Sequence, residues 1–184
     1  MDYTLQLFKY FSKFVPKAVL SEQFKQPQHS LKAGYAEIQS DILSIPDSSV
    51  IADVSRFICS ANTKYVEDSV RNAKGLILFV EYGEKMFNPE VGEFGLSRNI
   101  AITVASEVNM SNNDNLNEAM VINLCENVLD RILLTMSDDQ RNDMGCSTLG
   151  RFEFPANISP IDAESFFGRG GWTAMLTIKN TVCH

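Results

Sequence analysis

The pattern of apolar and polar residues is clearest between residues 75 and 136. Two apolar runs, Leu76–Tyr82 and Ile100–Ser106, precede a long amphipathic stretch from Leu116 to Met136. The first run is continuously apolar over residues 76–80, which is typical of a strand that is covered on both faces. The second run places branched residues on one face and small residues on the other. The pattern therefore predicts a β-β-α unit, in which a helix covers a strand hairpin.

The helix of this unit has a start signal, because Asn115 and Glu118 have the spacing of a capping box. Its apolar residues recur at intervals of mostly three and four positions, and we expect them to form one stripe. These residues are Leu116, Met120, Leu124, Val128, Leu129 and Ile132. Burial of each such side chain contributes roughly 1.5–3 kcal/mol, so the helix is expected to be a main core element.

Helical spacing also recurs in the first 75 residues. A helix is predicted over residues 3–15, with Asp2 as N-cap and Pro16 as stop. Further helices are predicted over residues 36–45 and 50–59, and from the capping residue Asn62 to a stop at Gly75.

Strand-like alternation returns near the end of the chain. Residues 151–154 and 171–178 alternate, and the residues between them supply turn chemistry at 155–160 and 166–171. The last strand suits an antiparallel partner among the earlier runs. The predicted fold is a single α+β domain over residues 1–184, with a mainly helical part (1–75) and a β-β-α-β-β part (76–184). Its sheet is mainly antiparallel or mixed and is covered by helices.

Composition narrows the classes of function. The chain has 184 residues and a formal net charge of −7, which argues against direct binding of nucleic acid, because phosphates demand a cationic face. Residues 1–33 are nevertheless basic, with five lysines against two acidic residues. This basic arm permits head-to-tail packing between copies, or it forms a solvated helix face. No apolar run approaches a membrane span and the N-terminus has no signal pattern, so we expect a cytoplasmic protein.

Residue patterns with known chemistry give no catalytic, cofactor-binding or metal-ligating residue. The four cysteines form no C-x-x-C pair, and the acidic run from Asp138 to Asp143 fails the spacing of a calcium loop. Gly168–Gly171 lacks the lysine of a phosphate loop. We therefore expect a protein that is not an enzyme. The alternative is a ligand-binding or enzymatic α+β domain, with Glu81 acting beside Glu84 or Glu107, or in a pocket near Glu81, Tyr82 and Arg98.

Contacts with protein partners are the remaining candidate for function. The predicted N-terminal helix carries aromatic residues beyond one stripe, so it either completes the core or docks a partner, as in a regulatory adaptor. The connector from Gly83 to Gly95 is longer than a tight hairpin needs, which is typical of a mobile or contact-making loop. The candidate interaction residues are Phe8, Phe11, Phe87, Phe94, Arg98 and Arg169. Arg169 is the cation best placed for a carboxylate of another subunit.

The order of elements, ending in Gly170-Gly-Trp-Thr-Ala-Met-Leu-Thr-Ile178, resembles that of phage and prophage tail-terminator and tail-completion proteins over residues 76–179. The resemblance implies a structural subunit that builds a ring at the end of a tail tube and is virion-associated. A ring needs two different complementary patches on each subunit. The candidates are the basic arm, the Gly83–Gly95 connector and the loop from Phe166 to Gly171.

Overall fold

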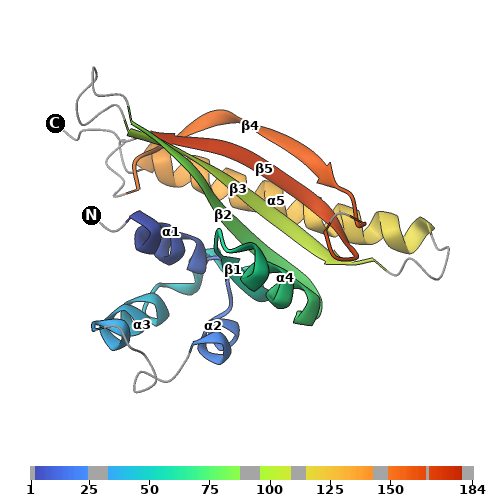
Figure 1. The fold of residues 1–184 in the computed structure, drawn as a ribbon, viewed down its shortest axis with the longest axis horizontal. Coiled ribbons are helices and arrows are strands. Elements are labelled where there is room, and N and C mark those ends of the chain that lie inside the picture. Colours follow the sequence, from blue (N-terminus) through green and yellow to red (C-terminus); the bar gives the residue numbers. More distant parts are fainter. Residues whose placement is uncertain are drawn as a thin grey trace.

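A computed structural model describes residues 3–24, 33–87, 96–108, 115–142, 149–164 and 166–179. Within these ranges the chain forms one five-stranded mixed sheet with helices on both of its faces, which confirms the predicted α+β class (Figure 1). The helices are α1 (Tyr3–Ser12), α2 (Lys17–Gln23), α3 (Tyr35–Leu43), α4 (Thr63–Asn72) and α5 (Asn115–Asn142), with a short 3-10 turn at Asp47–Ser49. The strands are β1 (Val54–Cys59), β2 (Leu76–Phe87), β3 (Leu96–Glu107), β4 (Arg151–Ile161) and β5 (Arg169–Lys179).

The strand order is β1-β2-β3-β5-β4, and β1 pairs parallel with β2 while the other pairs are antiparallel. Helix α5 crosses one face of this sheet (Figure 1). Its inner face packs with alternate residues of β2, β3 and β5 and with α1 in one core. The most deeply buried members of that core include Leu7, Phe11, Leu78, Ile102, Leu129, Ile132 and Met136. The predicted β-β-α unit and the antiparallel partner for the last strand are both confirmed.

The opposite face of the sheet is covered at one end by α4. Val66 and Val70 of this helix join Ile77 and Phe79 of β2 and Ala105 of β3 in a second, smaller core. Asn62 caps α4, because its Oδ1 accepts a hydrogen bond of 3.1 Å from the Tyr65 amide, as predicted. The continuous apolar run of β2 is therefore buried from both sides.

The helix predicted over residues 50–59 is wrong, because the chain forms the strand β1 there. Its composition, Val-Ser-Arg-Phe-Ile-Cys, favours a pleated and half-buried surface, and a short apolar run does not distinguish helix from strand by spacing alone. The edge of β1 is closed by a side chain. Gln23 donates a hydrogen bond of 2.8 Å to the Phe57 carbonyl and accepts one of 2.9 Å from the Phe57 amide. At this one residue the Gln23 amide takes the place of a neighbouring strand and satisfies the edge groups of Phe57.

Three further boundaries differ from the predictions. Strands β2 and β3 extend to Phe87 and from Leu96, so the connector expected over residues 83–95 is partly strand. Strand β4 continues through the turn expected at 155–160, with an irregularity between Glu153 and Asn157 that accommodates Pro155. Helix α5 runs on to Asn142 and includes the separate turn expected at Asp138.

The single stripe predicted on α5 is correct only in its second half. Val128, Leu129 and Ile132 are buried, whereas Leu116, Met120 and Leu124 are 72%, 64% and 40% exposed. The reason is geometric: each step of four residues advances about 40° beyond a full helical turn, so an i, i+4 series winds around the helix. Helix α5 therefore carries a second apolar face, which points away from its own sheet.

Candidate interaction surfaces

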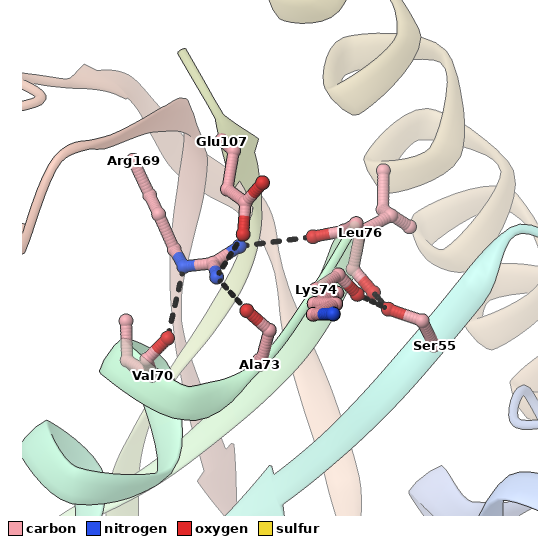
Figure 2. A network of polar contacts seen from close by, with 8 residues as sticks. Ser55, Val70, Ala73, Lys74, Leu76, Glu107 and Arg169 are labelled. Carbon is pink, nitrogen blue, oxygen red and sulfur yellow. Dashed lines mark hydrogen bonds and ion pairs between the residues drawn. The ribbon is translucent and has the colours of Figure 1, made fainter. Parts of the chain in front are cut away.

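Arg169 is the most strongly bound of the candidate residues. It begins β5, directly after Gly168, whose φ of 80° turns the chain. Its guanidinium donates hydrogen bonds to the carbonyl oxygens of Val70 (3.0 Å), Gly75 (2.9 Å) and Ala73, which are the groups at and just beyond the end of α4 (Figure 2). Carbonyls at a helix C-terminus lack partners inside the helix and attract a cation. Arg169 is thus a cap supplied from a distant strand.

Arg169 was expected to bind a carboxylate of another subunit, but its guanidinium is engaged by these carbonyl groups of its own chain. Arg169 is 2% exposed, and its ion pair of 3.2 Å is with Glu107 of its own chain. The sequence gives no sign of this contact, because residues 70–75 and 169 are brought together only by the pairing of β2, β3 and β5. The structure therefore gives Arg169 an intramolecular function.

Arg98 lies on the face of β3 that is turned toward α1. Its guanidinium carbon is 3.9 Å from the centroid of the Tyr3 ring, a cation–π contact. The antiparallel register places Lys85 of β2 directly opposite Arg98, so two cations are neighbours on the same face. Burial raises the pKa of the Tyr3 hydroxyl well above its usual value, and the Arg98 charge only partly offsets this.

The residues expected to line one pocket, Glu81, Tyr82 and Arg98, do not share a face of the sheet, although Glu81 itself lines a groove. Glu81 pairs with Ala101 and lies on the face of α4, whereas Tyr82 and Arg98 lie on the core face. Glu107 is six residues beyond Ala101 along β3, at a distance of roughly 20 Å for a strand, and it is held by Arg169. Glu81 and Glu107 are thus divided between two sites, while Glu84 lies with Glu81 in β2.

The aromatic candidates have different environments. Phe11 is fully buried, and Phe8 packs edge-to-face against Phe57 with ring centroids 5.0 Å apart. Both belong to the chain's own packing, which favours a core role for α1 over the adaptor hypothesis. Phe87 is 63% exposed near the end of β2, beside Met86, which is 50% exposed. Phe94 lies outside the described residues.

Two cavities adjoin these residues. The first is a groove of about 710 Å³ on the part of the sheet that α4 leaves open. Its lining includes Glu81, Asn99, Asn157, Met175 and Thr177. The second is a pocket of about 320 Å³ between β1 and the helices α1, α2 and α3. Its lining is mainly aromatic and aliphatic and includes Phe8, Phe24, Ile38, Phe57 and Tyr65. The volumes of both cavities fall within the usual range of volumes for ligand pockets.

The basic arm is neutralised inside the chain wherever the structure describes it. Lys9 pairs with Asp41 at 3.1 Å, and Lys17 pairs with Asp47 at 3.3 Å. Lys13 forms an ion pair with Asp139 of α5, whose carboxylate also accepts a hydrogen bond of 2.6 Å from the Tyr10 hydroxyl. These three lysines bind acidic residues of their own body. Lys25 and Lys32 lie outside the described residues.

In the ranges that the structure describes, no set of three or more His, Cys, Asp or Glu side chains is grouped to hold a metal ion. No helix within those ranges has the length and apolarity to cross a membrane. No protein-family model, curated protein or solved structure matches the chain.

The outer face of α5 is the largest set of exposed apolar side chains on one element among the described residues. It consists of Leu116, Met120, Leu124 and Leu134, and the last of these is 67% exposed. Met120 and Leu134 are two heptads apart, and Asn127 lies midway between them, so the three share one side of the helix. An amphipathic helix on a sheet normally has one apolar face. Helix α5 has in addition these four exposed apolar side chains, with the exposed polar residues Asn123, Asn127 and Asp130 between Met120 and Leu134.

Proposed function

We propose that this chain is a non-enzymatic structural subunit that assembles with further copies of itself through the outer face of α5. The observation that carries the proposal is the second apolar face of this helix. Large exposed apolar patches on a soluble protein commonly mark sites of protein contact. A helix that is apolar on two sides is suited to lie between its own sheet and a neighbouring subunit.

The magnitude of this surface decides what kind of association to expect. Complete burial of a Leu or Met side chain contributes about 2 kcal/mol, so covering the exposed fractions of the four side chains contributes roughly 5 kcal/mol per copy. Association costs an estimated 4–15 kcal/mol in lost translational and rotational freedom. The free energy gained by burying these side chains is thus similar in size to the cost of association. Assembly should therefore depend on concentration and gain from contacts outside α5.

A ring-forming subunit of the tail-terminator type is the form of assembly that we favour. Its support is the β-β-α-β-β order of elements over residues 76–179, on which the resemblance to those proteins rests. A ring also needs a second patch that differs from the first. The exposed Met86 and Phe87 near the end of the β2–β3 hairpin supply apolar surface on a different element from α5.

Sedimentation velocity over a range of concentrations tests the proposal. The double variant Met120→Glu, Leu134→Glu places two charges on the outer face of α5, and we expect it to weaken self-association at least tenfold. The control, Ala36→Glu with Ser40→Glu, adds the same charges to exposed positions of α3 and should associate as the native chain does. Equal association of the two variants would refute the assignment of this face.

A further inference from the structure

Lys85 and Arg98 form a cross-strand pair of like charges. They are directly opposite in the antiparallel register of β2 and β3, so their side chains emerge on one face of the sheet. Like charges that are directly opposite destabilise a sheet. In an acidic chain with a net charge of −7, two adjacent cations need an explanation.

A second pair of opposite cations occurs on the two neighbouring strands, at the same end of the sheet. Arg151 of β4 is directly opposite Lys179 of β5. The chain provides a carboxylate for this pair, because Glu153 forms an ion pair with Lys179 at 2.5 Å. For Lys85 and Arg98, no carboxylate of the described residues lies within 4.0 Å. One cation pair thus has its counter-ion and the other lacks it.

The surroundings of Arg98 increase the demand for an anion. Its guanidinium is held over the Tyr3 ring at 3.9 Å, and its Nε is buried with no hydrogen-bond partner among the described residues. The Tyr3 hydroxyl beside it is also buried without a partner there. A cation held in such a partly desolvated place gains more from a nearby carboxylate than a cation in open water does. Tyr and Arg that are already held in place are also the residue types most enriched at binding hot spots.

We propose that Lys85 and Arg98, supported by Tyr3, form a site that receives a carboxylate of a second copy of this chain. The inference rests on the proposed function and adds the chemistry of one contact to it. The guanidinium and the ammonium bind the carboxylate from two sides, as charge-assisted hydrogen bonds. A second copy supplies the anion because the rest of the chain is rich in acidic residues, and opposite charges favour its approach.

The test compares Lys85→Gln and Arg98→Gln with the matched control Arg151→Gln in sedimentation velocity at low salt. A hydrogen bond to a charged group contributes about 1.5–3 kcal/mol, so each of the first two variants should raise the dissociation constant of self-association about tenfold or more. Arg151→Gln, whose neighbour Lys179 keeps Glu153, should change it less than twofold. Urea unfolding of dilute Lys85→Gln should show no loss of stability, because the substitution removes repulsion within the chain.

The outcomes separate this inference from the proposal on which it rests. If the native chain associates and the Lys85 and Arg98 variants associate equally well, the carboxylate site is refuted while assembly stands. If these variants unfold at lower urea concentration and associate normally, the anion comes from the same chain, which also refutes the site. A native chain that stays monomeric overturns the proposed function and this site together. Weaker association of both variants, with a normal control, supports the site.

Discussion

Replacement of Arg169 by methionine tests how the distant halves of the domain are joined. The variant keeps an apolar side chain of moderate length and removes the donors that bind the carbonyl oxygens of Val70, Ala73 and Gly75. Because the C-terminal carbonyls of α4 would then lack donors, we expect the helix end to loosen from β5. The variant should fold to the same structure with lower stability.

The magnitude follows from the exposure of the three carbonyl residues. Val70 is fully buried and Ala73 is 7% exposed, whereas Gly75 is exposed and its carbonyl regains water. Two buried bonds from a charged donor, at about 1.5–3 kcal/mol each, give roughly 3–6 kcal/mol before relaxation. Removing the cation also removes the cost of its burial. The expected loss is therefore about 3–4 kcal/mol, a large part of the ~5–15 kcal/mol of a typical domain.

Urea denaturation followed by circular dichroism measures this loss as a lower midpoint with an unchanged slope. Arg169→Lys keeps the charge and loses the planar fork, so it should lie between the native chain and the methionine variant. Glu107→Gln is the control, because the Glu107 side chain is 59% exposed and its pair contributes about 1 kcal/mol or less. A methionine variant within 1 kcal/mol of the native chain would show that Arg169 does not hold α4 in place.

Two further predictions concern close packing and buried thiols. A Cβ on Gly171 would lie 2.1 Å from the Val104 carbonyl oxygen and 2.7 Å from the Ala105 Cα, so Gly171→Ala should lower the unfolding free energy by about 3 kcal/mol or more. The control is Gly168→Ala, whose Cβ meets no atom within 4 Å and which should cost only about 1 kcal/mol of backbone strain. Equal urea midpoints for the two variants would contradict the register of β3 and β5. Burial raises the pKa of the Cys59 thiol to about 12 and that of Cys125 to about 11, so the folded chain keeps both protons at a pH where the unfolded chain has lost them, and stability should fall as pH rises from about 9 toward 12. In a Cys146→Ser, Cys183→Ser background, the buried Cys125 should react with iodoacetamide at pH 8 far more slowly in the folded than in the urea-unfolded chain, and the partly buried Cys59 should be slowed less; equal rates for Cys125 would contradict its burial.

Local pattern was sufficient for the elements whose neighbours are close in sequence. The apolar run of β2, the alternation of β3 and the Asn62 cap of α4 each depend on residues within a few positions, and all three are confirmed. β1 was missed because its strand character depends on a parallel partner that begins 22 residues later, with Val54 opposite Leu76. The closure of its edge by Gln23 depends on a separate helix.

The interaction surfaces were less accessible to sequence reasoning for a similar reason. Exposure of Met120 and Leu124 follows from the roughly 40° that each i, i+4 step adds around the helix, which places them away from the side that buries Val128, Leu129 and Ile132. The Lys85–Arg98 pair depends on the irregularity between Tyr82 and Lys85, which sets which residues are opposite. Arg98 was singled out from sequence, whereas its partner Lys85 could be found only from the register.

Self-association of the native chain is the most direct test of the account. Sedimentation velocity in low salt should show a species larger than the monomer, whose share grows with protein concentration and falls in the Met120→Glu, Leu134→Glu variant. A single monomeric species over the whole range of concentrations would contradict the proposal that this protein is an assembly subunit.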